Sequence, residues 1–149
     1  MIVTFCGYRD RIITPALKEW LYRSIAAQIL AGADQFYPGG CGSFDRAAAS
    51  AVREAKKAYP HIRSTLILPY PDRKVDASLY DDTEYPPLEA VPRRYAIVMR
   101  NRWMIDAADV VIADVERGWG GAAEALEYAK KKKKTVINCI VDVLHKSEL

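Results

Sequence analysis

Short apolar runs alternate along this chain with longer segments in which apolar residues recur every three or four positions. Such runs, rich in β-branched residues, are typical of buried strands, and the longer pattern is typical of amphipathic helices. The runs predict five strands, at residues 2–6, 34–38, 64–68, 110–114 and 135–140. The helical pattern predicts helices at residues 15–31, 43–59, 93–108 and 122–132, and a short helix after residue 142. Thr14 and Pro15 suit the N-cap and the first position of the first helix.

Strands that alternate with helices favour a parallel sheet, because each parallel pair needs a crossover connection. We therefore predict an α/β fold, a Rossmann-like, doubly wound parallel sheet of about five strands with helices on both faces. Residues 1–149 are enough for one domain of this kind. Residues 70–92 are rich in proline and charge and lack a steady period, which predicts a long loop that forms a lid or side wall beside the site.

Composition narrows the chemistry that this fold could carry. The apolar runs are far shorter than the roughly 20 residues of a membrane helix. The start of the chain lacks the pattern of a secretory signal, so we expect a cytoplasmic protein without a membrane partner. Three cysteines without C-x-x-C spacing favour reduced thiols. The two histidines lie at no metal-ligand spacing, so neither a metal, a cofactor nor a Ser-His-Asp triad is predicted.

The net charge of +3 is small, and much of it comes from five consecutive lysines at residues 130–134. Lysines at the end of a predicted helix complement its dipole and are usually solvated. The chain also lacks a basic stripe interleaved with aromatic residues, which proteins that bind single strands commonly use. We therefore do not expect nucleic acid as a partner.

Three loops follow predicted strands, and in an open parallel sheet the loops at the carboxyl ends of the strands converge on the ligand. The first contains Gly7, Tyr8 and Arg9. The glycine permits a tight turn there, and the guanidinium suits a phosphate or a carboxylate. The alternative is an ordinary turn with an exposed arginine.

The second loop is rich in glycine and leads into a predicted helix. Glycines allow close backbone approach and the helix start offers free amides to an anion, so the predicted ligand contacts are Gly39, Gly40, Gly42, Ser43 and Asp45. The carboxylate of Asp45 is suited to accept ribose hydroxyls, or it acts only on the helix dipole. The segment is neither a P-loop nor a complete G-x-G-x-x-G motif.

The third loop has the same character and precedes the helix at 122–132. Its predicted ligand contacts are Gly118, Trp119, Gly120, Gly121 and Ala122, with the indole able to stack on a base. The alternative is a glycine-rich turn in which Glu124 favours the helix dipole. Just before the strand at 110–114, Arg100 and Asn101 complete the set, with a surface ion pair as the alternative for the arginine.

Several of these segments occur in the order found in one superfamily. The run R-N-R-W-M-I-D at 100–106, the strand A-D-V-V-I-A at 108–113 and the turn G-G-A at 120–122 follow G-Y-R at 7–9 and the glycine loop that ends in Asp45. Together they resemble the SLOG superfamily over nearly the whole chain, with the YpsA-like (DUF1273) group as the nearest branch. The later part of the pattern is similar, more distantly, to the LOG phosphoribohydrolases.

The SLOG resemblance implies a protein that binds or senses a phosphate-bearing nucleotide derivative such as ADP-ribose or NAD. It places the phosphates on the backbone amides of the second and third loops. Ribose would be held by Asp45 and Asn101, and the charge would be neutralised by Arg9 and Arg100. The resemblance also implies a homodimer.

More distant resemblances imply two other functions. A LOG-like phosphoribohydrolase would cleave the N-glycosidic bond of a nucleoside monophosphate, with Arg100 on the phosphate or sugar and Glu124 stabilising oxocarbenium charge or activating water. Gly121 replaces the threonine of the phosphoribohydrolase signature and Ala122 that of the YpsA-like pattern, which favours binding over turnover. The DprA proteins of the same superfamily bind single-stranded DNA, and this is the weakest of the three interpretations. Whether the chain is an enzyme stays open.

Overall fold

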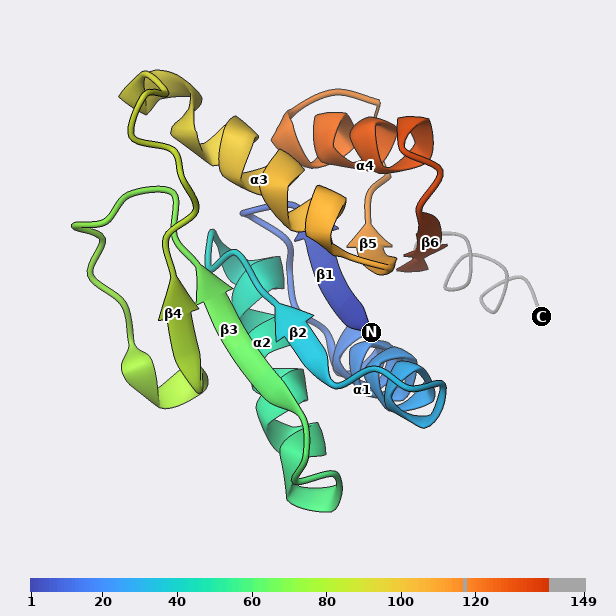
Figure 1. The fold of residues 1–149 in the computed structure, drawn as a ribbon. Helices are drawn as coiled ribbons and strands as arrows, with labels where there is room; N and C mark the ends of the chain where they lie inside the picture. The colour runs from blue at the N-terminus through green and yellow to red at the C-terminus, as the bar shows by residue number, and fades with distance from the viewer. Residues whose placement is uncertain (117, 140–149) are drawn as a thin grey trace.

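The computed structural model describes residues 1–116 and 118–139. Within them a six-stranded sheet has the order β4-β3-β2-β1-β5-β6, with every neighbouring pair parallel (Figure 1). The strands are β1 Ile2–Gly7, β2 Gln35–Tyr37, β3 Arg63–Ile67, β4 Asp82–Glu84, β5 Val110–Asp114 and β6 Thr135–Asn138. The helices are α1 Pro15–Leu30, α2 Ser43–Ala58, α3 Ala96–Ala107 and α4 Gly121–Lys131, with 3-10 helices at Ala77–Leu79 and Arg93–Tyr95. The predicted α/β fold is confirmed.

The sequence pattern does not predict β4, which lies within residues 70–92. Its three residues are polar and exposed, so no apolar run marks them. They pair with residues 65–67 of β3 and extend the sheet at one edge. That residues 70–92 also act as a lid stays a prediction. Residue 140 of the predicted fifth strand and the helix predicted after residue 142 lie outside the described residues.

Helices cover both faces of the sheet, as predicted. On one face α1 and α2 pack against each other, and on the other α3 packs against α4 (Figure 1). Side chains along β1 point alternately to the two faces of the sheet. Val3 and Phe5 join the core under α1 and α2. Cys6 and Tyr8 instead join the cluster that includes residues of α3 and α4. The central strand is therefore buried on both sides.

The helix starts follow from their local sequences. Thr14 is the N-cap of α1, and its hydroxyl accepts a hydrogen bond of 3.2 Å from the Leu17 N–H, with Pro15 at the first position, as predicted. In contrast, α2 and α4 begin after the glycine N-caps Gly42 and Gly120, which carry no side chain. In the described part of the chain, no helix has the length and apolar character needed to cross a membrane.

The order of the strands creates a divergence at the centre of the sheet. From β1 the chain passes to β2 and β3 on one side, and it later fills the other side with β5 and β6. Gly7, at the end of β1, lies opposite Asp114, at the end of β5. The connections that leave these two strands run to opposite faces, and such a divergence is where ligands bind in open α/β sheets.

Candidate functional site

A cavity of about 590 Å³ opens at this divergence. Its floor is the end of β1 and the loop that follows, and its walls come from α3, the first turn of α4 and the start of α2. Eight residues that the sequence proposes for the site line it: Gly7, Tyr8, Arg9, Asp45, Arg100, Asn101, Gly121 and Ala122. The volume lies within the ~300–1,000 Å³ of ordinary small-molecule sites.

The N-terminus of α4 forms one wall of the cavity. Gly120 is its N-cap and adopts a φ of 95°, a left-handed conformation that favours glycine. No side chain of the described residues caps the first-turn amides. Apart from the chain neighbours of Gly121 and the backbone of α4 itself, no atom of the described residues lies within 4 Å of the point where a Gly121 side chain would begin. The amides of Gly121 and Ala122 are therefore available to an anion in the cavity, where the helix dipole also favours negative charge.

Asp45 contributes a buried carboxylate to the same cavity. Its side chain is 8% exposed, and its Oδ2 accepts a hydrogen bond of 2.9 Å from the Cys41 N–H. Burial raises the pKa of Asp45, although the Cys41 hydrogen bond and the Arg100 charge act against this. Within the described part of the chain, its Oδ1 accepts no hydrogen bond. This oxygen is placed to accept a hydroxyl group of a ligand.

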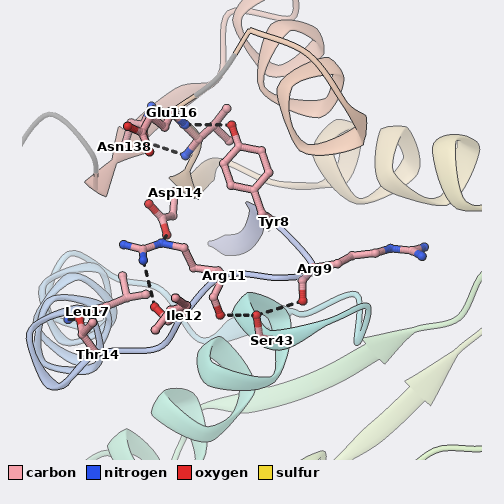
Figure 2. A network of polar contacts seen from close by, with 11 residues as sticks. Tyr8, Arg9, Arg11, Ile12, Thr14, Leu17, Ser43, Asp114, Glu116 and Asn138 are labelled. Atoms are coloured by element: carbon pink, nitrogen blue, oxygen red, sulfur yellow. Dashed lines mark hydrogen bonds and ion pairs between the residues drawn. The ribbon is translucent and has the colours of Figure 1, made fainter.

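In the loop after β1, the Arg9 side chain is exposed, whereas the backbone of the loop is held by Ser43. The Arg9 guanidinium is exposed and makes no ion pair or hydrogen bond with another described residue. Figure 2 shows its side chain extending away from Arg11. Ser43, predicted as a ligand contact, lies outside the cavity lining, and its hydroxyl contacts the carbonyl oxygens of Arg9 (3.0 Å) and Arg11 (2.6 Å). Ser43 therefore ties α2 to the first loop, while Arg9 remains available.

The glycines of the first two loops make room for protein atoms. A Cβ at Gly7 would lie 2.3 Å from the Phe44 ring, and one at Gly42 would lie 2.3 Å from the Arg9 Cα. At Gly39 it would lie 3.2 Å from the Arg100 guanidinium, and the Gly40 carbonyl accepts a hydrogen bond of 2.6 Å from Arg73. Of these four, only Gly7 lines the cavity.

Arg100 is buried between α3 and the ends of β2 and β3, at 1% exposure. Its Nη1 donates to the carbonyl oxygens of Gly39 (2.7 Å) and Ile67 (2.8 Å). Its Nε donates to Asn101 Oδ1 (3.0 Å) and its Nη2 to Cys41 Sγ (3.3 Å). Four of the five N–H groups of the guanidinium are therefore used within the protein.

The other proposed residues lie around the cavity rather than in its lining. Glu124 is exposed and lines a small groove between α3 and α4 that adjoins the cavity and shares Asn101, Gly121 and Ala125 with it. Trp119 is 68% exposed just before α4, and Gly118 has open space around it. The structure therefore brings Arg100 but not Glu124 into the cavity lining.

A polar network that the sequence did not reveal fixes the loop after β5 (Figure 2). The Asn138 amide pairs with both the N–H and the carbonyl oxygen of Val115, each at 3.1 Å. The Tyr8 hydroxyl accepts a hydrogen bond of 3.0 Å from the Glu116 N–H. No local pattern could have shown this, because the partners lie on three separate strands or loops. The network anchors the segment that leads to α4.

Two further residues line the cavity but were not predicted from the sequence as site residues. Cys6 and Cys41 both line it, and Cys41 lies at the loop before α2. Burial, followed by the charges of Asp45 and Asp114, raises the pKa of Cys6 to about 12. Within residues 1–116 and 118–139, no three histidine, cysteine, aspartate or glutamate side chains gather as a metal site.

Comparisons with known proteins support the fold. Neither a scan against protein-family models nor a search of curated proteins finds a match. A molybdenum cofactor binding protein from Rippkaea orientalis is similar in structure, with a TM-score of 0.65 and 20% identity over 92% of this chain and 74% of that one. DNA processing protein A from Helicobacter pylori matches with a TM-score of 0.65 and 21% identity, over 93% and 64%. The same protein from Streptococcus pneumoniae matches with a TM-score of 0.65 and 17% identity, over 91% and 49%.

At these identities the likeness shows a shared Rossmann-like architecture alone, and the SLOG superfamily stays a prediction. The YpsA-like branch stays a prediction. The chain spans less than two thirds of the two DNA processing proteins. The expectation that nucleic acid is not a partner finds no support, because one of these structures was solved for its mode of binding single-stranded DNA.

Proposed function

We propose that this chain binds a phosphate-bearing nucleotide derivative of the ADP-ribose or NAD class in the cavity between β1, α3 and α4. The observation that carries the proposal is the meeting of two complementary groups in one cavity. The uncapped N-terminus of α4 at Gly121 and Ala122 offers amides to a phosphate, and Asp45 offers a free carboxylate oxygen to a ribose hydroxyl.

Two further groups suit the same ligand. Arg9 supplies an exposed guanidinium at the cavity, able to form paired hydrogen bonds with phosphate oxygens. Asn101 uses its Oδ1 for Arg100 and keeps its amide N–H groups for the ligand. The molybdenum cofactor binding protein with a similar fold supports ligand binding by this architecture.

The geometry supports binding more strongly than hydrolysis. A phosphoribohydrolase would need Arg100 and Glu124 to act on one substrate. Four N–H groups of Arg100 are already engaged within the protein, and Glu124 lies in the neighbouring groove. Gly121 and Ala122 also lack the hydroxyl of a threonine.

Thermal unfolding with a panel of ligands tests the proposal. The panel contains ADP-ribose, NAD, AMP and a single-stranded oligonucleotide, and each mixture is then analysed by chromatography for released base. We expect ADP-ribose or NAD to stabilise the protein by about 2.7 kcal/mol at a concentration of about 100 times Kd, without released base. Released base would favour the hydrolase, and stabilisation by the oligonucleotide alone would contradict the proposal.

A further inference from the structure

Two arginines converge on one cysteine sulfur at the wall of the cavity. Cys41 lies between β2 and α2 and is partly exposed. Its Sγ accepts hydrogen bonds from Arg73 Nη1 at 3.0 Å and from Arg100 Nη2 at 3.3 Å. Neither arginine neighbours Cys41 in sequence, so the fold alone assembles this group.

Among the hydrogen-bond acceptors of these two guanidinium groups, the sulfur is the one that can carry a negative charge. The other acceptors of the Arg100 guanidinium are an amide and two carbonyl oxygens, and Arg73 donates otherwise to the Gly40 carbonyl. Among the described residues, no carboxylate lies within 4.0 Å of either guanidinium. Cys41 is therefore the one hydrogen-bonded acceptor that can ionise, and a buried guanidinium strongly favours an anionic partner.

The pKa of Cys41 depends on its two arginines and on the groups that surround them. Burial raises the pKa of the Cys41 thiol, but the charge of Arg100 and the hydrogen bond from Arg73 outweigh it and lower the pKa below its ordinary value. Asp45 faces the group from α2 and holds the Cys41 N–H. Tyr80 lies near Asp45 and Arg73, and burial raises its pKa, so its hydroxyl stays neutral.

Asp45 also shows that the cavity beside Cys41 is prepared for a polar molecule. Its side chain is more than nine-tenths buried, yet within the described residues its Oδ1 accepts no hydrogen bond. A small molecule with an O–H group that enters the cavity can donate to this oxygen. The same molecule then lies in the cavity that the Cys41 sulfur lines.

We propose that Cys41 is an oxidation site for small hydroperoxides, held as a thiolate by Arg73 and Arg100. The sulfur attacks the terminal oxygen of the hydroperoxide, so that an S–O bond forms and the O–O bond breaks. The sulfur is oxidised by two electrons to a sulfenate, and the hydroperoxide is reduced. The proton of the terminal O–H passes to the leaving oxygen, which departs as an alcohol, or as water when the oxidant is hydrogen peroxide. The reaction needs no nucleotide in the cavity.

Hydrogen peroxide treatment of the folded chain, with dimedone trapping and peptide mass spectrometry, tests the proposal. We expect the dimedone adduct on Cys41, with Cys6 and Cys139 unmodified because both are buried. In the untreated protein, the rate of Cys41 alkylation by iodoacetamide should reach half its maximum at a pH below roughly 8.5, the pKa of an ordinary cysteine thiol. An absent adduct or an ordinary pH profile would overturn the proposal.

Substitution of Arg73 separates the electrostatic role from a structural one. Arg73→Gln should slow Cys41 alkylation at pH 7 about tenfold, because a rise of one unit in the thiol pKa lowers the thiolate fraction by that factor. Arg73→Lys keeps the charge and should restore most of the rate. The control is Arg53→Gln, since Arg53 donates to the Ser78 carbonyl oxygen of the same 70–92 segment and does not contact Cys41. Equal rates in Arg73→Gln and Arg53→Gln would contradict the proposed clamp.

Discussion

Arg100→Met is expected to lower the free energy of unfolding by about 3–5 kcal/mol, the range found when one partner of a buried charged network is removed. The guanidinium is 1% exposed and donates to the carbonyl oxygens of Gly39 and Ile67. Methionine fills a similar volume but removes the donor that both carbonyl groups share, which is unfavourable in a dry interior. The Cys41 sulfur also loses one of its two cations.

Urea unfolding of Arg100→Met and Arg102→Met measures the difference. Arg102 lies on the same helix but is exposed, where it contacts the Tyr128 ring at 5.3 Å, so its loss should lower stability by about 1 kcal/mol or less. Equal losses in the two variants would show that Arg100 is not a structural residue. The result also governs how an inactive Arg100 variant is interpreted, because loss of the fold removes any activity.

Gly121→Asp is expected to weaken ADP-ribose binding about 100-fold, since like charges a few ångströms apart repel by several kcal/mol near a protein surface. The new carboxylate would stand at the N-terminus of α4, on the cavity wall where we place a phosphate. The free energy of unfolding should be unchanged, because no described atom beyond the helix backbone and the neighbouring residues lies within 4 Å of the new Cβ, and an acid in the first turn favours the helix dipole. Binding and stability are thus separated in one variant.

Titration calorimetry with ADP-ribose compares Gly121→Asp with Gly118→Asp. The control adds the same charge three positions earlier, again with open space around the new Cβ, but outside the cavity lining. We expect Gly118→Asp to bind within about threefold of the natural protein, since exposed charges farther away are screened. If both variants bind as tightly as the natural protein, the phosphate does not lie on α4.

Periodicity was sufficient for most of the fold, because buried strands and amphipathic helices both depend on local patterns of apolar residues. The helix start at Thr14 and Pro15 and the strand Val110–Asp114 are predicted correctly from a few neighbouring residues. The edge strand Asp82–Glu84 was missed because it is polar and exposed throughout. Its position depends on pairing with β3, which no local pattern reports.

The convergence of the loops could also be predicted, because parallel strands place their carboxyl ends at one edge. Asp45, Gly121 and Ala122 reach the cavity as that principle requires. The individual roles could not be predicted, because they depend on contacts between distant segments. Arg100 and Gly39 lie 61 positions apart, and Ser43 contacts a loop 32 to 34 positions earlier.

The Cys41 group illustrates the same limit. A single cysteine between two glycines carries no signal in the sequence, and the three cysteines predict only reduced thiols. Its two cations come from a loop 32 positions later and from a helix 59 positions later. Only the folded chain shows that one thiol stands between two guanidinium groups while Cys6, in the same cavity, stands near Asp45 and Asp114.

Backbone amide chemical shifts during titration of the 15N-labelled protein with ADP-ribose test the central claim most directly. We expect the amide signals of Gly121 and Ala122 to move and to saturate together. A second cavity of about 510 Å³, between α1 and α2 and lined by Lys18, Ala47 and Ala51 among others, serves as the internal reference and should not respond. Saturable shifts of the amide signals of residues that line the second cavity, with unchanged signals for Gly121 and Ala122, would contradict the account.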